Sequence, residues 1–371
     1  MKFVPVNEPS LDGNELKYLT ECIRSGWISS EGPFVEKFEF EFAKRVGRKK
    51  GISVSNGTAA LELSVAALGI GPGDEVILPS FTIISCAAAI IRCGAKPVLV
   101  DCDRETWNMS VDQVANKITD RTKAVMAVHI FGLPVDMDSL LALCEKHGLL
   151  LIEDSAESIG LEYDGRPCGG FGDISAFSFY ANKHVTMGEG GFVAVDDEAL
   201  AETCFSLRNL CFKDPRFIHD RLGWNMRITN IQAAIGLAQL ERLDQLIKIK
   251  RQMGKRYTDL LSGVSGLQLP LSATDSAKNV YWVYGIVLDE SVQFDAQEAM
   301  HRLKERNIGT RPFFWPMHEQ PVFIKDGLFA GETYSISENI ARRGFYLPSG
   351  VTLTYHQIDY VAESLIEILE T

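Results

Sequence analysis

From about residue 50 onward, short runs of aliphatic and β-branched residues alternate with longer segments whose apolar positions recur at helical spacing. Short apolar runs bounded by turn residues are typical of buried strands, and the segments between them are typical of helices that cover a sheet. The expected strands are Gly51–Ser55, Glu75–Pro79, Pro97–Asp101, Ala124–His129 and Leu149–Glu153. The expected helices are Thr58–Leu68, Ile84–Cys93, Val111–Ile118 and Asp136–His147. This alternation predicts a wound α/β fold whose mostly parallel sheet carries helices on both faces.

The pattern changes after Asp173. Two strand-like runs, Ile174–Tyr180 and Gly191–Val195, flank a loop, and long helical patterns follow at Asp197–Leu210 and Asn230–Arg256. Farther along, the chain predicts a smaller α+β unit with one strand and two helices, at Tyr281–Leu288, Asp295–Arg306 and Tyr355–Glu370. We therefore expect a large domain over residues 1–250 and a small C-terminal domain over residues 251–371.

Composition and charge narrow the class of protein. The 371 residues are 46% hydrophobic and 23% charged, as expected for a chain that folds throughout. The net charge of −12 argues against a protein that binds nucleic acid through its phosphates. The nearest approach to a basic cluster is Lys248, Lys250 and Arg251. Because Glu241 and Asp244 accompany them on the same predicted helix, we expect an ordinary solvated face there.

The eight cysteines form no Cys-x-x-Cys pair and mostly fall in apolar segments, which is typical of reduced, buried thiols. No N-terminal stretch combines a basic start with an apolar core, as a signal peptide would. No apolar run approaches the roughly 20 residues that a membrane helix needs. We therefore expect a cytoplasmic protein without a membrane or nucleic-acid partner.

Three short segments carry candidate chemistry, and the first is VSNGTAA at residues 54–60, where an expected strand leads into a helix. A glycine at this place exposes backbone N–H groups, and the helix dipole favours an anion such as a phosphate. Plain capping of the helix by Ser55, Asn56 or Thr58 would explain the same residues. The segment has neither the glycine spacing of a dinucleotide fingerprint nor the Gly-Lys-Ser/Thr of a P-loop.

The second segment is LLLIEDSAE at residues 149–157, an apolar strand that ends in acidic residues. The carboxyl ends of parallel strands face the crevice where α/β proteins bind ligands, so Asp154 can be directed at a ligand from a rigid support. Capping of the next turn is the alternative, and metal binding is a weaker one. Because the histidines are scattered along the chain, we expect no metal site.

The third segment is SAFSFYANKHVTMGEGG at residues 175–191, which surrounds Lys183. Phe179, Tyr180 and the glycine turns would partly shield its amine from water, which lowers the pKa of a lysine and leaves it nucleophilic toward a carbonyl. A solvated surface lysine is the alternative for this residue taken alone. Together, a phosphate cradle, a strand-end aspartate and a shielded lysine in one α/β domain indicate a site for pyridoxal 5′-phosphate (PLP).

In these and further segments, the chain resembles the DegT/DnrJ/EryC1/StrS family of sugar aminotransferases, which have the type I (aspartate aminotransferase) PLP fold. The resemblance implies a large PLP-binding domain with a mixed, mostly parallel sheet and a small C-terminal α+β domain. The segments that carry it are GWISSEGPFVEKFE (26–39), SNGTAAL (55–61), GPGDEVILPSFT (71–82), IEDSAESIG (152–160), FGDISAFSFYANKHVTMGEGG (171–191), GWNMRITNIQAAIGLAQLERLD (223–244) and TRPFFWPMH (310–318).

The resemblance also implies roles for single residues. Lys183 would hold PLP covalently, Asp154 would pair with the nitrogen of its pyridine ring, and Glu157 would lie near the ring. The residues that would bind the cofactor phosphate are Gly57, Thr58, Ser178 and, from the second subunit of a homodimer with shared active sites, Asn225. Those that would border the substrate are Trp27, Ser29, Arg227, Arg311 and His318.

The sequence departs from the family pattern at one position. Family members usually carry an aromatic residue directly after the threonine of PSFT, where this chain has Ile83, and Phe81 lies two residues earlier. Aliphatic packing by Ile83 would then replace aromatic stacking on the cofactor ring. A dehydratase branch of the family has histidine in place of the lysine, but here Lys183 itself matches the aminotransferase pattern and His184 is only its neighbour.

The implied reaction is transfer of an amino group from L-glutamate to the keto carbon, expected to be C4, of a nucleotide-linked 4-keto-6-deoxy sugar. Such enzymes serve the synthesis of surface polysaccharides such as the O-antigen of lipopolysaccharide. A PLP-dependent 3-dehydratase of a GDP-linked keto sugar and an aminotransferase for a dTDP, UDP or CDP sugar are the alternatives. A noncatalytic PLP-binding regulator would need an added DNA-binding region or a basic face, for which the chain has neither room nor charge.

Overall fold

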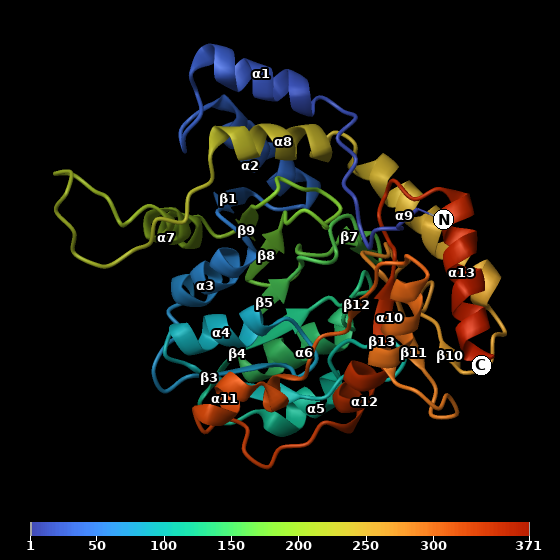
Figure 1. Ribbon diagram of the computed structural model, residues 1–371. Helices are drawn as coiled ribbons and strands as arrows, with labels where there is room; N and C mark the ends of the chain where they lie inside the picture. Colours follow the sequence, from blue (N-terminus) through green and yellow to red (C-terminus); the bar gives the residue numbers. More distant parts are fainter. Residues whose placement is uncertain (1, 371) are drawn as a thin grey trace.

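The computed structural model, which describes residues 2–370, is built around a seven-stranded sheet (Figure 1). Its strands are β1 (Lys50–Val54), β2 (Glu75–Pro79), β3 (Lys96–Val100), β4 (Thr122–Val128), β5 (Leu150–Asp154), β8 (Ile174–Ser178) and β9 (Gly191–Val195). They lie in the order β1-β9-β8-β5-β4-β2-β3. All seven strands expected in this half of the chain are confirmed, with ends that move by no more than two residues.

One strand reverses direction within the sheet. β2, β3, β4, β5 and β8 pair in parallel, whereas β9 runs antiparallel to both β8 and β1. β1 lies at the edge of the sheet beside β9 and not beside β2. Its pattern of apolar residues nevertheless resembles that of the central strands. Because Ser178 and Gly191 are paired across β8 and β9, the loop that contains Lys183 is anchored at both ends on adjacent strands.

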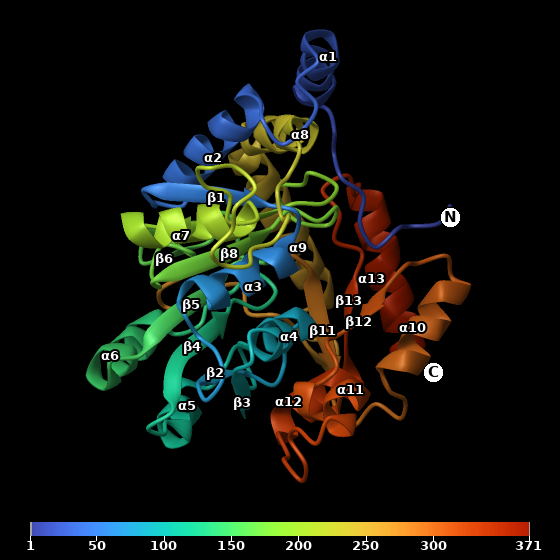
Figure 2. The ribbon, with the colours of Figure 1, turned by 90° about the vertical axis from the view of Figure 1, so that its left-hand side faces the viewer.

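Helices cover both faces of this sheet, as Figure 2 shows. One face packs into a hydrophobic cluster with α3 (Gly57–Ala67), α4 (Ile84–Arg92) and α7 (Glu198–Arg208). The other face packs with α2 (Pro33–Arg45), α5 (Val111–Lys117), α6 (Met137–His147) and α8 (Asn230–Leu240), and α1 (Glu15–Ser25) lies on α8. The α/β architecture with helices on both faces is therefore confirmed.

The helix expected over Asn230–Arg256 is two helices. α8 begins with a capping box at Thr229 and ends at Leu240, and α9 (Leu243–Leu261) follows after a break at Glu241 and Arg242. The break contains neither glycine nor proline, so no local stop signal predicts the end of α8. The buried side of α9 then packs against the C-terminal part of the chain.

The C-terminal part contains a second, four-stranded sheet in the order β10-β11-β13-β12. The elements of this part are β10 (Leu267–Gln268), β11 (Tyr284–Leu288), α10 (Ala296–Glu305), β12 (Arg311–Pro312), a 3-10 turn (Met317–Glu319), α11 (Pro321–Lys325), α12 (Ser335–Arg343), β13 (Gly344–Leu347) and α13 (Tyr355–Leu369). A separate short hairpin, β6 (Glu162–Tyr163) with β7 (Arg166–Pro167), lies in the earlier half of the chain. α9, α10 and α13 form one apolar cluster with this sheet, which Val4 of the N-terminal segment joins. The division at residue 250 stays a prediction.

All eight cysteines lie within the described residues, are free thiols, and are buried except for the partly exposed Cys93. Burial raises the pKa of several of these thiols, including Cys204 to about 12, so they stay protonated. Within residues 2–370, no helix has both the length and the apolar character required to cross a bilayer.

An aromatic cluster under the lysine loop ties the loop to the sheet. The ring of Phe42 on α2 lies 5.1 Å from that of Phe177 on β8 and 4.9 Å from that of Phe179, the first residue after β8. All three side chains are fully buried. The packing of α2 therefore supports the start of the loop that positions Lys183.

Replacing Phe42 with alanine should lower the free energy of unfolding by about 3–5 kcal/mol, because it leaves a cavity in a closed cluster. Phe40 on the same helix is 66% exposed, and Phe40→Ala is the matched control, with an expected change below about 0.5 kcal/mol. Urea unfolding followed by tryptophan fluorescence, at one protein concentration, measures both variants. Equal losses in the two variants would contradict this role for the Phe42 cluster.

Candidate active site

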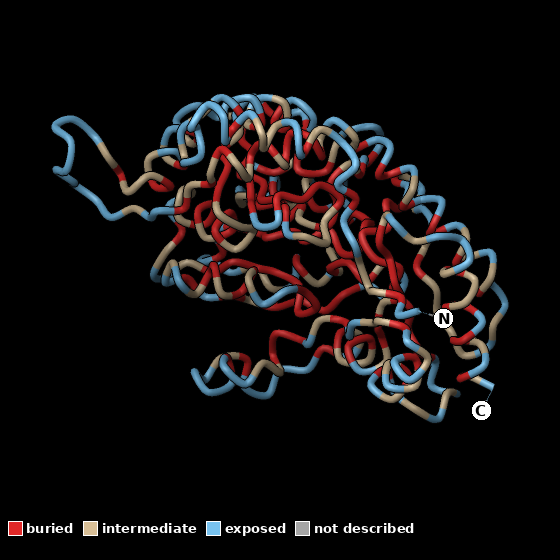
Figure 3. The backbone as a smooth tube through the Cα atoms, turned by 45° about the horizontal axis from the view of Figure 1, so that its top comes forward, coloured by how far each residue is buried: buried red, intermediate tan, exposed pale blue. Residues whose placement is uncertain are grey.

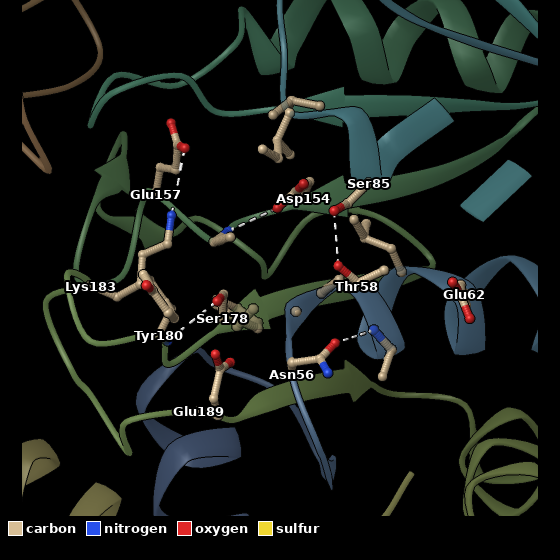
Figure 4. Close-up of a pocket in the computed structure, with 18 of the residues that line it drawn as sticks. Asn56, Thr58, Glu62, Ser85, Asp154, Glu157, Ser178, Tyr180, Lys183 and Glu189 are labelled. Carbon is tan, nitrogen blue, oxygen red and sulfur yellow. Dashed lines mark hydrogen bonds and ion pairs between the residues drawn. The ribbon is translucent and has the colours of Figure 1, made fainter. Parts of the chain in front are cut away.

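A cavity of about 750 Å³ opens where the N-termini of α3 and α4 meet the carboxyl ends of β5 and β8 (Figure 4). The structure brings seven of the residues predicted from sequence to its lining: Gly57, Thr58, Ile83, Asp154, Glu157, Ser178 and Lys183. They come from segments that are far apart in the chain and meet only through the sheet order.

The N-terminus of α3 forms one end of the cavity. Asn56 caps the helix by accepting a hydrogen bond of 2.9 Å from the N–H of Ala59. A Cβ atom at Gly57 would lie 2.8 Å from the Cβ of Ser178, so glycine is required for this close approach. Capping and anion binding are compatible here, because the first N–H groups of a helix have no partner within it. Thr58 Oγ1 is fixed by a 2.8 Å hydrogen bond to Ser85 Oγ on α4.

Asp154 is the last residue of β5 and is only 3% exposed. Its Oδ1 accepts a 3.0 Å hydrogen bond from the N–H of Ala156, and its Oδ2 accepts a 3.2 Å bond from the thiol of Cys86. Burial raises the pKa of the Asp154 carboxyl above its usual value, and Ala156, Cys86 and the positive charge of Lys183 oppose this effect. The site would therefore gain from one more positive group beside this carboxylate.

Lys183 lies in the loop between β8 and β9, and its side chain is only 9% exposed. Its Nζ is 3.6 Å from Glu157 Oε1 and 3.6 Å from the centroid of the Trp282 ring. Burial lowers the pKa of Lys183, while the charges of Glu157 and Asp154 oppose the shift. Lys183 is therefore shielded as expected, but the indole face of Trp282 lies over its amine, whereas the expected Phe179 packs in the Phe42 cluster.

Glu157 lies close enough to Lys183 to exchange a proton with it. Burial raises the pKa of Glu157 to about 7, and the neighbouring Lys183 charge partly opposes the shift. Its other carboxylate oxygen, Oε2, accepts a 3.0 Å hydrogen bond from the N–H of Phe131. A carboxyl that titrates near neutral pH beside an amine of lowered pKa can exchange a proton with it at small cost.

The position that departs from the family pattern faces the cavity. Ile83 is 40% exposed and lines the space, whereas Phe81 is fully buried and packs against Phe131 and Phe313. An aliphatic side chain therefore occupies the wall at this place. Phe81 belongs to the core and does not line the cavity.

Arg311 and His318, two candidates from the TRPFFWPMH segment, lie in different surroundings. Arg311 is exposed and lines a smaller cavity of about 220 Å³, which shares Tyr180, Trp282 and other walls with the main one. Its guanidinium bonds only the carbonyl of Thr310 among the described residues, at 3.2 Å. His318 is buried away from both cavities, where its ring nitrogens contact Ser80 Oγ at 2.9 Å and Glu338 Oε1 at 3.0 Å.

The remaining candidates do not line the main cavity of their own chain. They are Trp27, Ser29, Asn225 and Arg227. Trp27 is half-exposed, Asn225 is exposed, and Arg227 donates a hydrogen bond to Asn209 Oδ1. Asn225 follows an exposed arm, residues 212–222, that projects from the body between α7 and α8 (Figures 1 and 3).

Three residues at the site were not predicted from the sequence, and two of them line the cavity. Trp282 and Tyr346 reach the cavity from the C-terminal sheet region, and Cys86 stands behind Asp154. Trp282 also donates a 3.0 Å hydrogen bond from its indole Nε1 to the carbonyl of Asn182, next to Lys183. Apolar spacing marks these residues as core, and no local signal indicates a site.

The adjacent His184 turns away from the cavity. Its Nε2 lies 3.0 Å from the carbonyl oxygen of Val280, and burial lowers its pKa to about 3. The ring is therefore a neutral core group at ordinary pH. This placement agrees with its interpretation as a neighbour of Lys183.

Comparison with known proteins places this geometry in a family. The model of the DegT/DnrJ/EryC1/StrS aminotransferase family matches residues 9–366. The chain is 42% identical to a GDP-perosamine synthase of Vibrio cholerae, over 98% of each chain. It superposes with a TM-score of 0.92 on the aminotransferase TlmJ from Streptoalloteichus hindustanus, at 33% identity and 99% coverage of both chains. A Streptococcus pneumoniae protein in its PLP form gives a TM-score of 0.92 at 25% identity, with 99% of each chain covered.

These matches extend over almost the full length of the chain and agree in fold and in family. The chain belongs to the DegT/DnrJ/EryC1/StrS aminotransferase family.

Proposed function

We propose that this protein is a PLP-dependent aminotransferase that transfers an amino group from L-glutamate to C4 of GDP-4-keto-6-deoxymannose. The observation that carries the proposal is the placement of Lys183 and Asp154 on the walls of one cavity, with the N-terminus of α3 at its end. Each of the three groups that a PLP site requires thus lies on the wall of the same cavity. Family membership makes the amino-transfer class the natural one.

The residues fit the cofactor in charge and in shape. Gly57, Thr58 and Ser178 would hold the phosphate at the α3 N-terminus, where backbone N–H groups favour an anion. Asp154, whose pKa burial raises, would gain a further positive partner besides Lys183 from a protonated ring nitrogen. Ile83 would pack its aliphatic side chain against the cofactor.

When bound, PLP supplies an aldehyde that condenses with amines and a protonated ring that draws electrons from the reacting carbon. With PLP bound, Lys183 Nζ would take the proton from the α-carbon of the donor and return it to the carbon that the PLP aldehyde supplied, because its lowered pKa makes the neutral amine available. Glu157, 3.6 Å from that amine, would hold the proton between these two transfers. Asp154 would keep the proton on the ring nitrogen, and Trp282, whose ring lies 3.6 Å from the amine, would exclude water from one side of it.

Two lines support the choice of substrate. Relatives that are 40–42% identical over 98–99% of this chain are named GDP-perosamine synthase. The unpaired guanidinium of Arg311 beside the cavity suits a carboxylate or a diphosphate, which it can bind with two parallel hydrogen bonds. The comparisons favour amino transfer over the dehydratase alternative. We place the reaction in the synthesis of surface polysaccharides such as O-antigen, in the cytoplasm.

We further propose a homodimer with shared active sites. Asn225, Arg227, Trp27 and Ser29 do not line the cavity of their own chain, yet Asn225 immediately precedes Met226, which does. The exposed arm at residues 212–222 carries large apolar side chains into solvent, among them Phe217 and Leu222. A second subunit would cover these side chains and receive Asn225 at its phosphate end. We also propose that residues 251–371 form a small C-terminal domain.

The reaction itself is the first test. Purified protein incubated with PLP, L-glutamate and GDP-4-keto-6-deoxymannose should yield the 4-amino sugar and 2-oxoglutarate in equal amounts, measured by mass spectrometry of the nucleotide sugars. Lys183→Ala should abolish turnover, because the amine that moves the proton is lost. Lys248→Ala, an exposed lysine on α9, is the control and should retain full activity.

A deoxy sugar without 2-oxoglutarate would instead identify a dehydratase, and turnover by Lys183→Ala at the wild-type rate would refute the mechanism. Repeating the assay with dTDP-, UDP- and CDP-linked keto sugars tests the nucleotide. Faster turnover of one of these would overturn the choice of GDP.

Shared active sites can be tested by complementation between two defective subunits, Lys183→Ala and Asn225→Ala. In a hybrid dimer isolated through two different tags, one site would contain both wild-type residues and the other neither. We expect about half of the wild-type activity per dimer, since one of two sites is intact. If Asn225 serves its own chain, the hybrid should be no more active than the Asn225→Ala homodimer.

A further inference from the structure

Cys86 contacts the residue that would hold the cofactor ring. It is fully buried in the first turn of α4, and its thiol donates to Asp154 Oδ2 at 3.2 Å. The other carboxylate oxygen accepts a 3.0 Å bond from the N–H of Ala156. Each oxygen of Asp154 therefore has one donor, from α4 on one side and from the turn after β5 on the other. These two donors fix the plane of the carboxylate.

The thiol keeps its proton in this environment. Burial raises the pKa of Cys86 well above that of a free thiol, and the charge of Asp154 raises it further. The only thiol proton is used on Asp154, so the Thr82 hydroxyl, 3.4 Å from the sulfur, donates to the sulfur in turn. The result is a chain of donors, Thr82 to Cys86 to Asp154, in which each bond polarises the next.

The same turn of α4 reaches the phosphate end of the cavity. Ser85, the residue before Cys86, bonds Thr58 at 2.8 Å, and Ile83 forms part of the cavity wall. One helical turn thus contacts the anion-binding end through Ser85 and the ring-nitrogen end through Cys86. The distance between the phosphate end and the ring-nitrogen end of the cavity therefore depends on the position of one rigid helix, α4.

We propose that Cys86 is a positioning residue for PLP, whose thiol orients the Asp154 carboxylate and keeps it ionised for the ring nitrogen. The inference rests on the proposed function and adds a residue that the family motifs do not assign. Cys86 acts through Asp154, and it forms no bond to the cofactor. No chemistry of the sulfur is involved beyond hydrogen bonding.

The choice of variants separates hydrogen-bond donation from packing. Cys86→Ser keeps a donor and Cys86→Ala removes it, while the two side chains differ by one hydroxyl. Cys86→Val removes the donor but keeps the volume filled, so the comparison survives if the alanine variant folds poorly. Cys93→Ala is the matched control, because Cys93 ends the same helix and its thiol contacts the carbonyl of Glu62 at 3.8 Å, away from Asp154.

The first readout is the dissociation constant of PLP from the full-length apoprotein, measured by fluorescence titration. Loss of one donor to a buried carboxylate should weaken binding about tenfold in Cys86→Ala and Cys86→Val. Cys86→Ser and Cys93→Ala should stay within about twofold of the wild type. Equal weakening in the serine and alanine variants would mean that packing is what matters, and this would overturn the proposal.

The second readout is the pH dependence of that dissociation constant, which a purely structural role would not move. Donation from Cys86 lowers the pKa of Asp154, so its removal raises that pKa. The acid limb of PLP binding should therefore move to higher pH in Cys86→Ala and return in Cys86→Ser. The other titratable groups around Asp154 are Lys183, His129 and Glu157, and no variant replaces them.

An unchanged acid limb in Cys86→Ala would overturn the role proposed for the thiol. Failure of the wild-type protein to bind PLP would instead refute the proposed function. The two failures are therefore distinguished by the wild-type titration.

Discussion

The burial of one amine against two carboxyl groups is the constraint on which the site depends. Removing Lys183 from water disfavours its charged form, whereas Glu157 and Asp154 favour it, and the balance leaves the pKa of Lys183 lowered. The same burial raises the pKa of Glu157 to about 7. Without the surrounding walls, the lysine would be a protonated surface cation, and the carboxyl groups would be ordinary ionised acids. The nucleophilicity of Lys183 therefore depends on the packing around its side chain.

The fold produces this arrangement through the position of one reversed strand. Because β9 runs antiparallel beside β8, the loop between them returns over the carboxyl ends of β8 and β5, where Asp154 ends its strand. Phe42 of α2 packs against Phe179 at the start of that loop. Trp282, next to the C-terminal sheet, donates a hydrogen bond to the carbonyl of Asn182 within the loop. Binding of a cofactor would thus draw on both parts of the chain, since the walls come from each.

Much of the fold and part of the cavity lining could be predicted from local sequence. Each central strand is a short apolar run bounded by turns, and Gly57 and Asp154 stand where such strands end, so their places follow from neighbours in the chain. Trp282 and Cys86 could not be predicted, because their roles arise when distant elements pack and their own surroundings look like core. Arg311 and His318 belong to one sequence motif, yet Arg311 lies in an exposed cavity wall and His318 in a buried hydrogen-bond network. Their different surroundings could not be predicted from the motif either.

The most direct test is to identify the lysine that carries the cofactor. Protein loaded with PLP is reduced with borohydride, digested and mapped by mass spectrometry. The account predicts one pyridoxyl group, on Lys183. Lys250 is the informative rival, because burial lowers its pKa to about 7 as well, yet its Nζ bonds the carbonyls of Trp282 and Ser349 instead of lining the cavity. Modification at Lys250, or at no lysine, would contradict the account.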